Sequence, residues 1–233
     1  MNQPVFDRFD NSSAGVTYTG IGAAIDQSNQ FVFPILRAES TTLSGQVAPQ
    51  GHLKTTRTSG EHLTLVAGYQ TRYNNRAALA GSMSLCSDTL MLENKSNRRF
   101  CEQLASWVFK DTGVLRASNL RHNAKGNACK VDEECPNPEN YKIEDHVEFY
   151  IDLDVKIEGV WYPYEADDIQ LQFIMLEPYY SVLLEREASG TPDKATYSYK
   201  FRVPERLGIF RFVVDYWRYG LTFLDEQNQV SVI

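Results

Sequence analysis

The sequence has no long hydrophobic run and no excess of positive charge. No segment approaches the roughly 18 consecutive apolar residues of a membrane-spanning helix, although 42% of the 233 residues are hydrophobic. The formal net charge of −7 argues against a nucleic-acid-binding protein, which usually carries a basic patch. The first ten residues, MNQPVFDRFD, lack the basic region and the apolar stretch of a signal peptide. These absences predict either a soluble cytosolic protein or a piece of a longer chain.

Cysteine and histidine are scarce, with four of each. Cys129 and Cys135 flank the polar run KVDEE, a spacing that lacks the pattern of a zinc site, and no second ligand pair follows. We therefore expect a disulfide between Cys129 and Cys135. Cys86 and Cys101 are compatible with a second disulfide or with reduced structural cysteines. The sequence predicts no metal site and no cofactor.

A cysteine nucleophile would require a partner base. Cys86 lies in MSLCSD rather than on a glycine-flanked turn, and no histidine stands in a recognisable pairing motif with it. An amidotransferase-like hydrolase would need a histidine within hydrogen-bond reach of Cys86, so we expect Cys86 to be buried or disulfide-bonded. The carboxylates of residues 165–168 lack the spacing of a calcium loop and are expected to form a solvated acidic turn.

The first half of the chain shows apolar runs followed by one helical stripe. Residues 63–67 and 77–80 are typical of strands buried on both faces. Phe100, Leu104 and Trp107 share one face of a helix predicted over residues 97–110, with Ser96 as its N-cap. The order strand, strand, helix predicts the C-terminal part of a Rossmann-like or amidotransferase-like α/β domain with a partly parallel sheet. We assign residues 1–118 to this domain.

The second half of the chain has a period of two. A polar, unpatterned run precedes it, and we assign residues 119–140 to a linker. Apolar and polar residues then alternate over residues 147–157, 197–203 and 209–216, and again within the central stretch 159–180. Short alternating strands with turns between them predict an antiparallel β-sandwich over residues 141–233. The fold class is therefore α/β followed by all-β.

Four motifs carry a resemblance to a known family. They are W-x-P-Y-x-x-x-D-I-Q-L-x-F at 161–173, G-x-Q-x-R-x-N-x-R at 68–76, W-V-F-K-x-x-G-V-L-R at 107–116, and L-G-I-F-R-F followed by D-Y-x-R-Y-G-x-T at 207–222. In this order they resemble the DDOST (Wbp-type, forty-eight-kilodalton) subunit of the endoplasmic-reticulum oligosaccharyltransferase complex. Leu85 and Cys86 replace an aromatic pair of that family, and the loop with Cys129 and Cys135 looks like an insertion. The family's signal peptide, the first part of its α/β domain and its C-terminal membrane helix are missing, so we expect a fragment with a membrane helix beyond its C-terminus.

The resemblance implies a non-catalytic scaffold on the lumenal side of the endoplasmic reticulum membrane. It would support N-linked glycosylation by holding other subunits, including the multispanning catalytic subunit and ribophorin- and DAD-type subunits. Asn11 and Asn94 stand in acceptor patterns for N-linked glycans, N-S-S and N-K-S. Trp161 and Trp217 are the expected interface anchors, because tryptophan is enriched among interface hot spots. The alternative is a secreted carbohydrate-binding or adhesion β-sandwich module.

Overall fold

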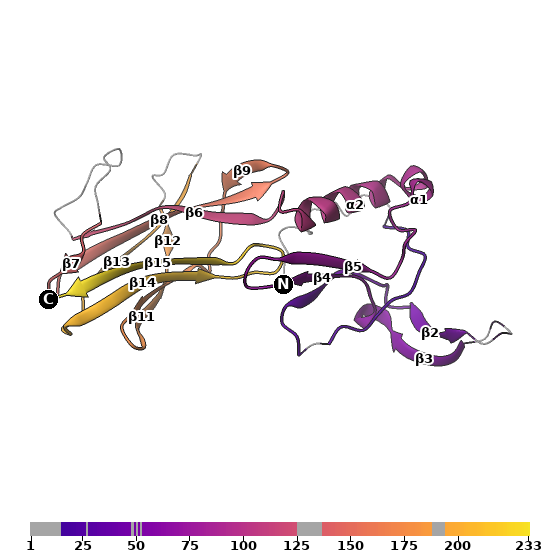
Figure 1. Cartoon of the computed structure of the whole chain (residues 1–233), viewed down its shortest axis with the longest axis horizontal. Helices are drawn as coiled ribbons and strands as arrows, with labels where there is room; N and C mark the ends of the chain where they lie inside the picture. Colours follow the sequence, from indigo (N-terminus) through magenta and orange to yellow (C-terminus); the bar gives the residue numbers. More distant parts are fainter. Residues whose placement is uncertain are drawn as a thin grey trace. The chain divides into compact units, whose positions relative to one another are not determined.

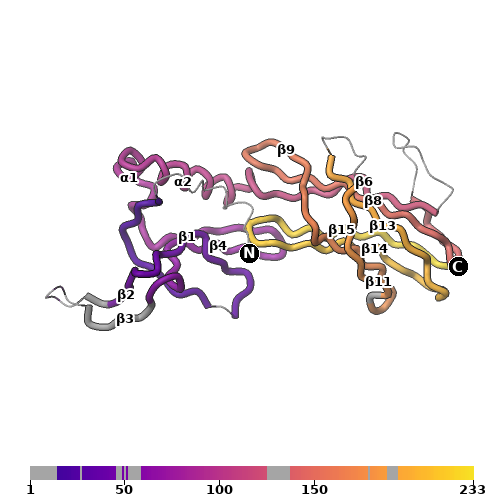
Figure 2. Tube along the Cα trace, turned by 180° about the vertical axis from the view of Figure 1, so that it is seen from behind, coloured from indigo at the N-terminus to yellow at the C-terminus, as the bar shows by residue number. Residues whose placement is uncertain are grey.

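The computed structural model describes residues 15–26, 28–47, 49, 51, 53–124, 137–187 and 194–233. It divides into two compact units, the first ending at Gly113 and the second beginning at Val114 (Figure 1 and Figure 2). Both units consist mainly of strands, and the helices belong to unit 1. No helix among the described residues is long and apolar enough to cross a membrane.

Unit 1 contains a three-stranded antiparallel sheet with two helices. The sheet has the order β1-β4-β5 and a separate hairpin joins β2 to β3. The elements are β1 (Val32–Arg37), β2 (Leu43–Val47), β3 (Leu53–Ser59), η1 (Gly60–His62), β4 (Thr64–Gln70), β5 (Arg76–Ala80), α1 (Asp88–Glu93) and α2 (Lys95–Val108). The partly parallel sheet expected from the apolar runs is wrong, because β4 pairs antiparallel with both neighbours. The burial expected for residues 77–80 is wrong too, because β5 is largely exposed and its Leu79 is 70% exposed. An apolar run therefore predicts a strand, but neither its burial nor the direction of its partners.

The core of unit 1 lies between the sheet and α2 (Figure 1). Phe33 of β1 and Trp107 of α2 are buried and meet edge to face, with ring centroids 5.6 Å apart. Side chains of β4 alternate between buried and partly exposed, so the strand is buried on one face rather than both. The predicted helix is present but begins at Lys95, with Asn94 rather than Ser96 as its N-cap. The Asn94 side chain accepts the Ser96 N–H at 2.9 Å.

Unit 2 consists of two five-stranded sheets. One has the order β11-β10-β14-β15-β7, and the other the order β12-β13-β8-β6 with β9 also paired to β8. The strands are β6 (Val114–Ala124), β7 (Asn140–Tyr141), β8 (His146–Ile157), β9 (Val160–Pro163), β10 (Gln170–Ile174), β11 (Pro178–Leu183), β12 (Glu185–Arg186), β13 (Ala195–Arg202), β14 (Gly208–Tyr216) and β15 (Leu224–Val232). The pairings are antiparallel except for β15 with β7, which is parallel.

The two sheets of unit 2 contact each other through aromatic side chains. Phe149 of β8 stacks on Phe212 of β14 with ring centroids 5.5 Å apart. Phe173 of β10 packs against Phe201 of β13 at 5.2 Å. The alternation in the sequence located these strands because one face of each is buried in this core.

The boundary between the units falls earlier than the sequence predicted. Residues 114–124, assigned to the end of the first domain and to the linker, form strand β6 of unit 2, which pairs with β8 along its length. A β-bulge between Ser118 and Arg121, with Asn119 at φ 50°, interrupts the period of two. Leu115 and His122 are the two buried residues of β6, and the second of them is polar and fully buried. Because of the bulge and the buried histidine, the alternating pattern did not reveal this strand. Residues 125–136 of the predicted linker lie outside the described residues.

Candidate interaction surface

The acidic loop before β10 is held by an ion pair to the turn after β14. The Asp168 carboxylate accepts the Tyr216 hydroxyl at 2.8 Å and the Arg218 Nε–H at 2.9 Å. Arg218 also donates to Asp168 through its Nη2. At the other end of the loop, Glu165 pairs with Arg186 at 2.7 Å. The acidic turn is exposed to solvent, as expected. The sequence did not show that two of its carboxylates also have guanidinium partners from distant parts of the chain.

A chain of tyrosines connects this ion pair to the core of unit 2. The Tyr216 hydroxyl lies 2.9 Å from that of Tyr164, and both rings are buried. Tyr197 donates its hydroxyl to the Tyr164 carbonyl at 2.9 Å and accepts the Ala166 N–H at 2.8 Å. Since Tyr216 belongs to β14 and Tyr197 to β13, the loop is fixed to both sheets. This anchoring gives the Asp168–Arg218 pair a defined position.

The charges of the pair stabilise each other. Partial burial opposes ionisation of Asp168, but the hydrogen bonds from Arg218 and Tyr216 outweigh it, so the pKa of the carboxyl lies below its usual range. Burial likewise opposes the Arg218 cation, and its bonds to Asp168 still raise the pKa of the guanidinium. Burial, followed by the hydrogen bond with Tyr164, raises the pKa of Tyr216 far above its ordinary value. Asp168 and Arg218 are therefore both charged at neutral pH, and Tyr216 remains a hydrogen-bond donor.

Trp217 and Tyr219 flank Arg218 in the same turn. Trp217 is half-buried, and its ring meets that of Tyr219 edge to face at 5.0 Å. Phe210 and Phe212 on β14 are fully buried, whereas Trp217, which follows the end of that strand, is only partly buried. The end of the turn is fixed by Thr222, whose buried hydroxyl oxygen accepts the Leu115 N–H at 2.7 Å.

Trp161 lies on β9 beside a second ion pair. The Arg116 guanidinium sits 4.2 Å from the centre of the Trp161 ring, in cation–π geometry. Arg116 also pairs with Asp154 of β8 at 2.7 Å. The indole remains 37% exposed, so Arg116 supports the ring without covering it.

The elements that carry these residues, β9, the start of β6 and the turn after β14, lie at the same end of unit 2 (Figure 1). The contact between Leu115 and Thr222 joins β6 to that turn. We call this end the Trp161–Arg218 surface. It comprises Arg116, Trp161, Asp168, Trp217, Arg218 and Tyr219. Tryptophan, tyrosine and arginine are the residue types enriched in protein interfaces, and here the arginines are already held by carboxylates. The geometry suits recognition of a partner surface.

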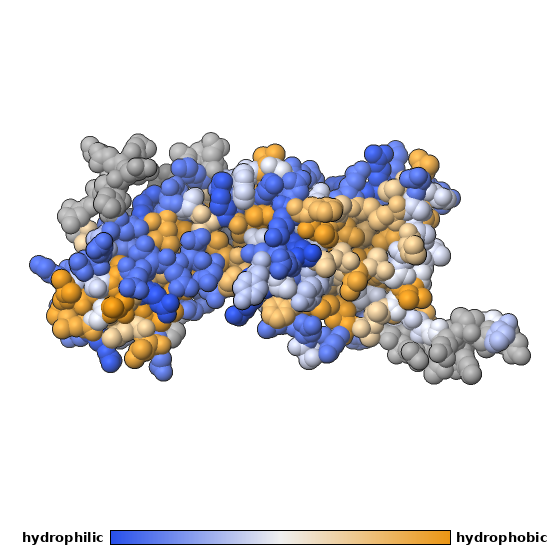
Figure 3. Space-filling view, in the orientation of Figure 1, coloured by the Kyte–Doolittle hydropathy of each residue, from blue (hydrophilic) through white to orange (hydrophobic). Residues whose placement is uncertain are grey.

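Other parts of unit 2 offer different chemistry. Apolar side chains gather where β14 begins (Figure 3). Leu207 and Ile209 are 64% and 57% exposed there. Exposed apolar patches of this kind mark surfaces of interaction when they are large. Among the described residues, no group of three or more His, Cys, Asp or Glu side chains is placed to hold a metal ion.

In unit 1, the polar motif residues form internal bonds. The Arg76 guanidinium donates to the carbonyls of Trp107, Thr112 and Gly113 at 2.9, 2.8 and 2.5 Å, at the C-terminal end of α2 and in the turn that follows it. Burial lowers the pKa of Arg76 to about 10, so the side chain is still charged at neutral pH. A Cβ on Gly68 would come within 2.8 Å of the Phe33 ring. Sequence reasoning missed the role of Arg76, because nothing in a motif shows which distant carbonyls a side chain reaches.

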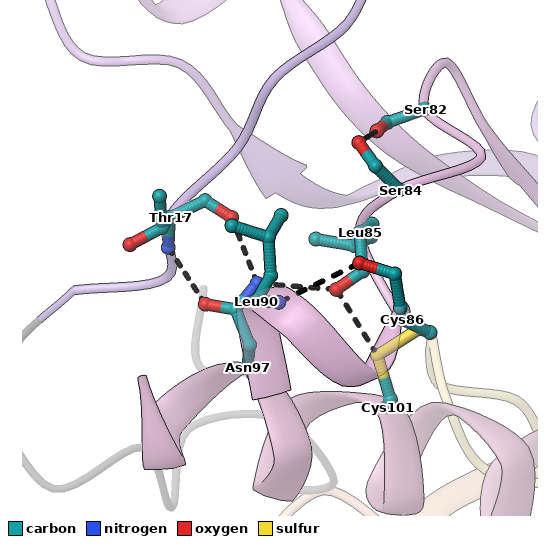
Figure 4. The surroundings of a disulfide bond; sticks show 9 residues. Thr17, Ser82, Ser84, Leu85, Cys86, Leu90, Asn97 and Cys101 are labelled. Atoms are coloured by element: carbon teal, nitrogen blue, oxygen red, sulfur yellow. Dashed lines mark hydrogen bonds between the residues drawn. A yellow bond between two sulfur atoms is a disulfide. The ribbon is translucent and has the colours of Figure 1, made fainter. Parts of the chain in front are cut away.

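The structure pairs Cys86 with Cys101 in a disulfide (Figure 4). The bond joins the loop before α1 to α2, and Leu85 of that loop is buried in the core with Val66 and Phe100. Cys86 is therefore not a thiol nucleophile, and the amidotransferase-like hydrolase loses the residue on which it depended. The predicted disulfide between Cys129 and Cys135 lies outside the described residues.

Of the two predicted glycan acceptors, the structure describes only Asn94. Asn11 lies outside the described residues. Asn94 is half-buried at the start of α2, and its side-chain amide is engaged in hydrogen bonds. The pattern N-K-S shows the acceptor chemistry but not these contacts, which come from residues almost eighty positions earlier in the chain.

Comparison with known proteins accounts for the motifs in both units. The OST48 N-terminal domain model matches residues 2–111, and the OST48 middle domain model matches residues 127–233. This chain belongs to the OST48 family. It is 32% identical over 230 residues to the dolichyl-diphosphooligosaccharide–protein glycosyltransferase 48 kDa subunit of Danio rerio. It is 31% identical over 236 and 232 residues to the subunits of that name in Drosophila melanogaster and Arabidopsis thaliana.

These alignments cover 93 to 94% of this OST48-family chain and 49 to 50% of the relatives. The chain thus spans about half the length of the curated relatives that it matches. Among solved structures, a β-glucosidase from Listeria innocua aligns with a TM-score of 0.27 and 11% identity, over 51% of this chain and 15% of that one. A likeness at this level supports no statement about fold or function.

The motifs that carry the family resemblance meet in the structure of unit 2. Asp168 of the central motif is bonded to Arg218 of the last motif. Leu115 of the motif at 107–116 is bonded to Thr222, also in the last motif. The Trp161–Arg218 surface is therefore built by three separate OST48-like motifs.

Proposed function

We propose that this chain is the lumenal part of a non-catalytic scaffold subunit of an oligosaccharyltransferase. The observation that carries the proposal is the match of two consecutive OST48 domain models to residues 2–111 and 127–233. The relatives are named as subunits of the enzyme that transfers a dolichyl-diphosphate-linked oligosaccharide to protein. In this proposal the chain supports that transfer to the Asn of Asn-X-Ser/Thr acceptors without performing it.

The roles of the motif residues favour scaffolding over catalysis. Arg76 holds the end of α2, Arg218 holds Asp168, and Thr222 holds Leu115. A catalytic acid, base or nucleophile must be available to a substrate, whereas these groups contribute bonds within the fold. The chemistry and any metal would belong to another chain of the complex.

A lumenal location is favoured by the disulfide. Disulfides persist in oxidising compartments, which include the lumen of the endoplasmic reticulum, and are rare in the cytosol. The Cys86–Cys101 bond fits that compartment. The remaining parts of the proposal are a membrane anchor in the complete protein and neighbours that include the multispanning catalytic subunit and ribophorin- and DAD-type subunits. Unit 1 would be the C-terminal part of a larger α/β domain.

The Trp161–Arg218 surface is the proposed contact with another subunit. The indole of Trp161 is 37% exposed and that of Trp217 is half-buried, and each lies next to an arginine fixed by a carboxylate. Holding both arginines in place before binding reduces the side-chain entropy that association must overcome. The two tryptophans would be the anchors, and the arginines would orient the partner.

Affinity purification of the complete protein from detergent-solubilised membranes tests the proposal. The expected result is co-purification of membrane-bound oligosaccharyltransferase subunits, identified by mass spectrometry of the native assembly. Trp217→Ala should lower their recovery, whereas Tyr73→Ala, which removes an 88% exposed aromatic ring from unit 1, should not. A protein that purifies alone and binds immobilised glycans would instead support the secreted carbohydrate-binding or adhesion module.

A further inference from the structure

An extended segment of unit 1, residues 15–23, is fixed to the body of the unit by hydrogen bonds to its backbone. We call this segment the strap. Asn97 on α2 is fully buried and bonds both backbone groups of Thr17: its Oδ1 accepts the Thr17 N–H and its Nδ2 donates to the Thr17 carbonyl, each at 2.8 Å (Figure 4). The Ile21 N–H donates to the Gly81 carbonyl at 2.9 Å. The strap therefore docks like an added strand, through side chains that imitate a strand neighbour.

The packing beneath the strap is close. Ser82 donates to the Thr19 carbonyl at 2.5 Å. A Cβ on Gly20 would come within 2.5 Å of the Gly81 carbonyl oxygen, whereas a Cβ on Gly15 would meet nothing within 4 Å. Docking thus tolerates a side chain at one end of the strap and excludes it in the middle.

Asn94 holds the beginning of the strap. Its Nδ2 donates to the Gly15 carbonyl at 2.8 Å and to the Thr17 hydroxyl at 3.0 Å. Its Oδ1 accepts the Ser96 N–H at 2.9 Å as the N-cap of α2. An amide nitrogen has two hydrogens, and both are used here.

The same nitrogen is the acceptor atom of the N-K-S pattern at residues 94–96. Glycan transfer breaks the bond between the sugar C1 and the diphosphate of a lipid-linked oligosaccharide and forms a bond between C1 and Nδ2. One amide proton leaves in that step. A carbon bonded to Nδ2 would occupy the space of one of the two oxygens now 2.8 and 3.0 Å away. Residues 15–17 of the strap cannot stay docked around a glycosylated Asn94.

We propose that Asn94 is a modification-gated tether: its amide either holds the docked strap or carries an N-linked glycan, but not both. In the docked state the strap shields the acceptor nitrogen. A chain that is modified before the strap docks keeps the strap released from Gly15 to Thr17. The modification arm of the proposal rests on the lumenal location proposed above, whereas the tether does not.

The tether is tested by hydrogen exchange on the 233-residue chain produced in bacteria. Asn94→Asp keeps the N-cap acceptor and removes both donors, whereas Ser96→Ala keeps all three bonds of Asn94 and removes the acceptor pattern. The Thr17 amide should exchange roughly tenfold faster in Asn94→Asp, as expected for loss of two hydrogen bonds, and at the wild-type rate in Ser96→Ala. Equal protection of Thr17 in the two variants would overturn the tether.

Whether a docked strap and a glycan on Asn94 exclude each other is tested by secreting the chain from eukaryotic cells with a fused reporter acceptor site. Gly20→Ala should raise the glycan occupancy of Asn94, and the matched control Gly15→Ala should leave it unchanged. The glycosylated fraction should lose protection at Thr17. Equal occupancy in the two variants, or a glycosylated chain with Thr17 still protected, would contradict the proposal. A modified reporter together with an unmodified Asn94 in both variants would overturn the modification arm of the proposal, whereas the bacterial experiment would still decide the tether.

Discussion

Arg76→Ala is the substitution that should damage unit 1 most. The side chain donates to one carbonyl in the last turn of α2 and to two in the turn that follows, and its guanidinium lies 5.0 Å from the centre of the Trp107 ring. A hydrogen bond to a charged group contributes about 1.5–3 kcal/mol, and a cation–π contact contributes about 0.5–2 kcal/mol. These contributions do not add fully, because water would reach some of the carbonyls once the side chain is gone. We expect the free energy of unfolding of unit 1 to fall by about 3–5 kcal/mol, the size typical of disrupting a buried charged group.

The assay must separate the two units. Native-state hydrogen exchange of the β4 amides reports on unit 1, and exchange of the β8 amides in the same sample reports on unit 2. Arg76→Lys should give an intermediate loss, because an ammonium group retains the charge but cannot span three carbonyls. The control is Arg98→Ala, which removes an exposed pair with Glu102 and should cost about 0.3–0.5 kcal/mol. A loss below about 1 kcal/mol for Arg76→Ala, or an equal loss in β8, would refute the role assigned to Arg76.

Three further substitutions test other contacts. Cys86→Ser should lower the stability of unit 1 by about 3 kcal/mol, as expected for loss of a disulfide that closes a loop of about 15 residues, and thermal melting measures this loss. The same substitution should leave glycosyl transfer by an assembled complex unchanged in a transfer assay. Burial lowers the pKa of His122 below 6.5, so as the pH falls the imidazole is protonated in the unfolded chain before it is protonated in the folded chain. The stability that neutral His122 contributes should be fully present above pH 6.5 and be lost as the pH falls through the folded pKa. The urea concentration at the unfolding midpoint should therefore fall less between neutral and acidic pH in His122→Phe than in the wild type. Thr222→Val keeps the shape of the side chain but removes the acceptor for the buried Leu115 N–H, so it should cost about 1–3 kcal/mol in unit 2, measured by exchange of the β6 amides.

The strands of unit 2 could be predicted because their alternation has a direct physical cause. In β8 and β14 the apolar residues face a shared aromatic core, so burial reproduces the pattern of the sequence. The same argument failed for β6. One of its two buried positions holds His122, which lies 2.8 Å from the Tyr141 hydroxyl through Nδ1 and 3.0 Å from the Asn228 Oδ1 through Nε2. A polar side chain with both nitrogens bonded can replace an apolar one in a core, and period analysis cannot recognise it.

The candidate surface could be predicted only in part. Residue type alone singles out Trp161 and Trp217 as anchors, and the structure places both at one end of unit 2, but their contact with a partner stays a prediction. The ion pair of Asp168 with Arg218 joins residues 50 positions apart, and the disulfide of Cys86 with Cys101 joins residues 15 apart. Such pairings depend on the tertiary fold. Spacing in the chain gives no access to them, whereas the ordered motifs identified the family.

We propose that this chain assists glycosyl transfer through a surface rather than through a catalytic site. The most direct test replaces the cellular OST48-family subunit with a complete protein that carries Trp161→Ala and Trp217→Ala. Two measurements are compared: recovery of the catalytic subunit, and transfer activity per assembled complex. Because truncation of a hot-spot residue costs about 2 kcal/mol or more, we predict at least roughly a tenfold loss of recovery with unchanged activity per complex. Unchanged recovery together with lost activity would contradict the claim.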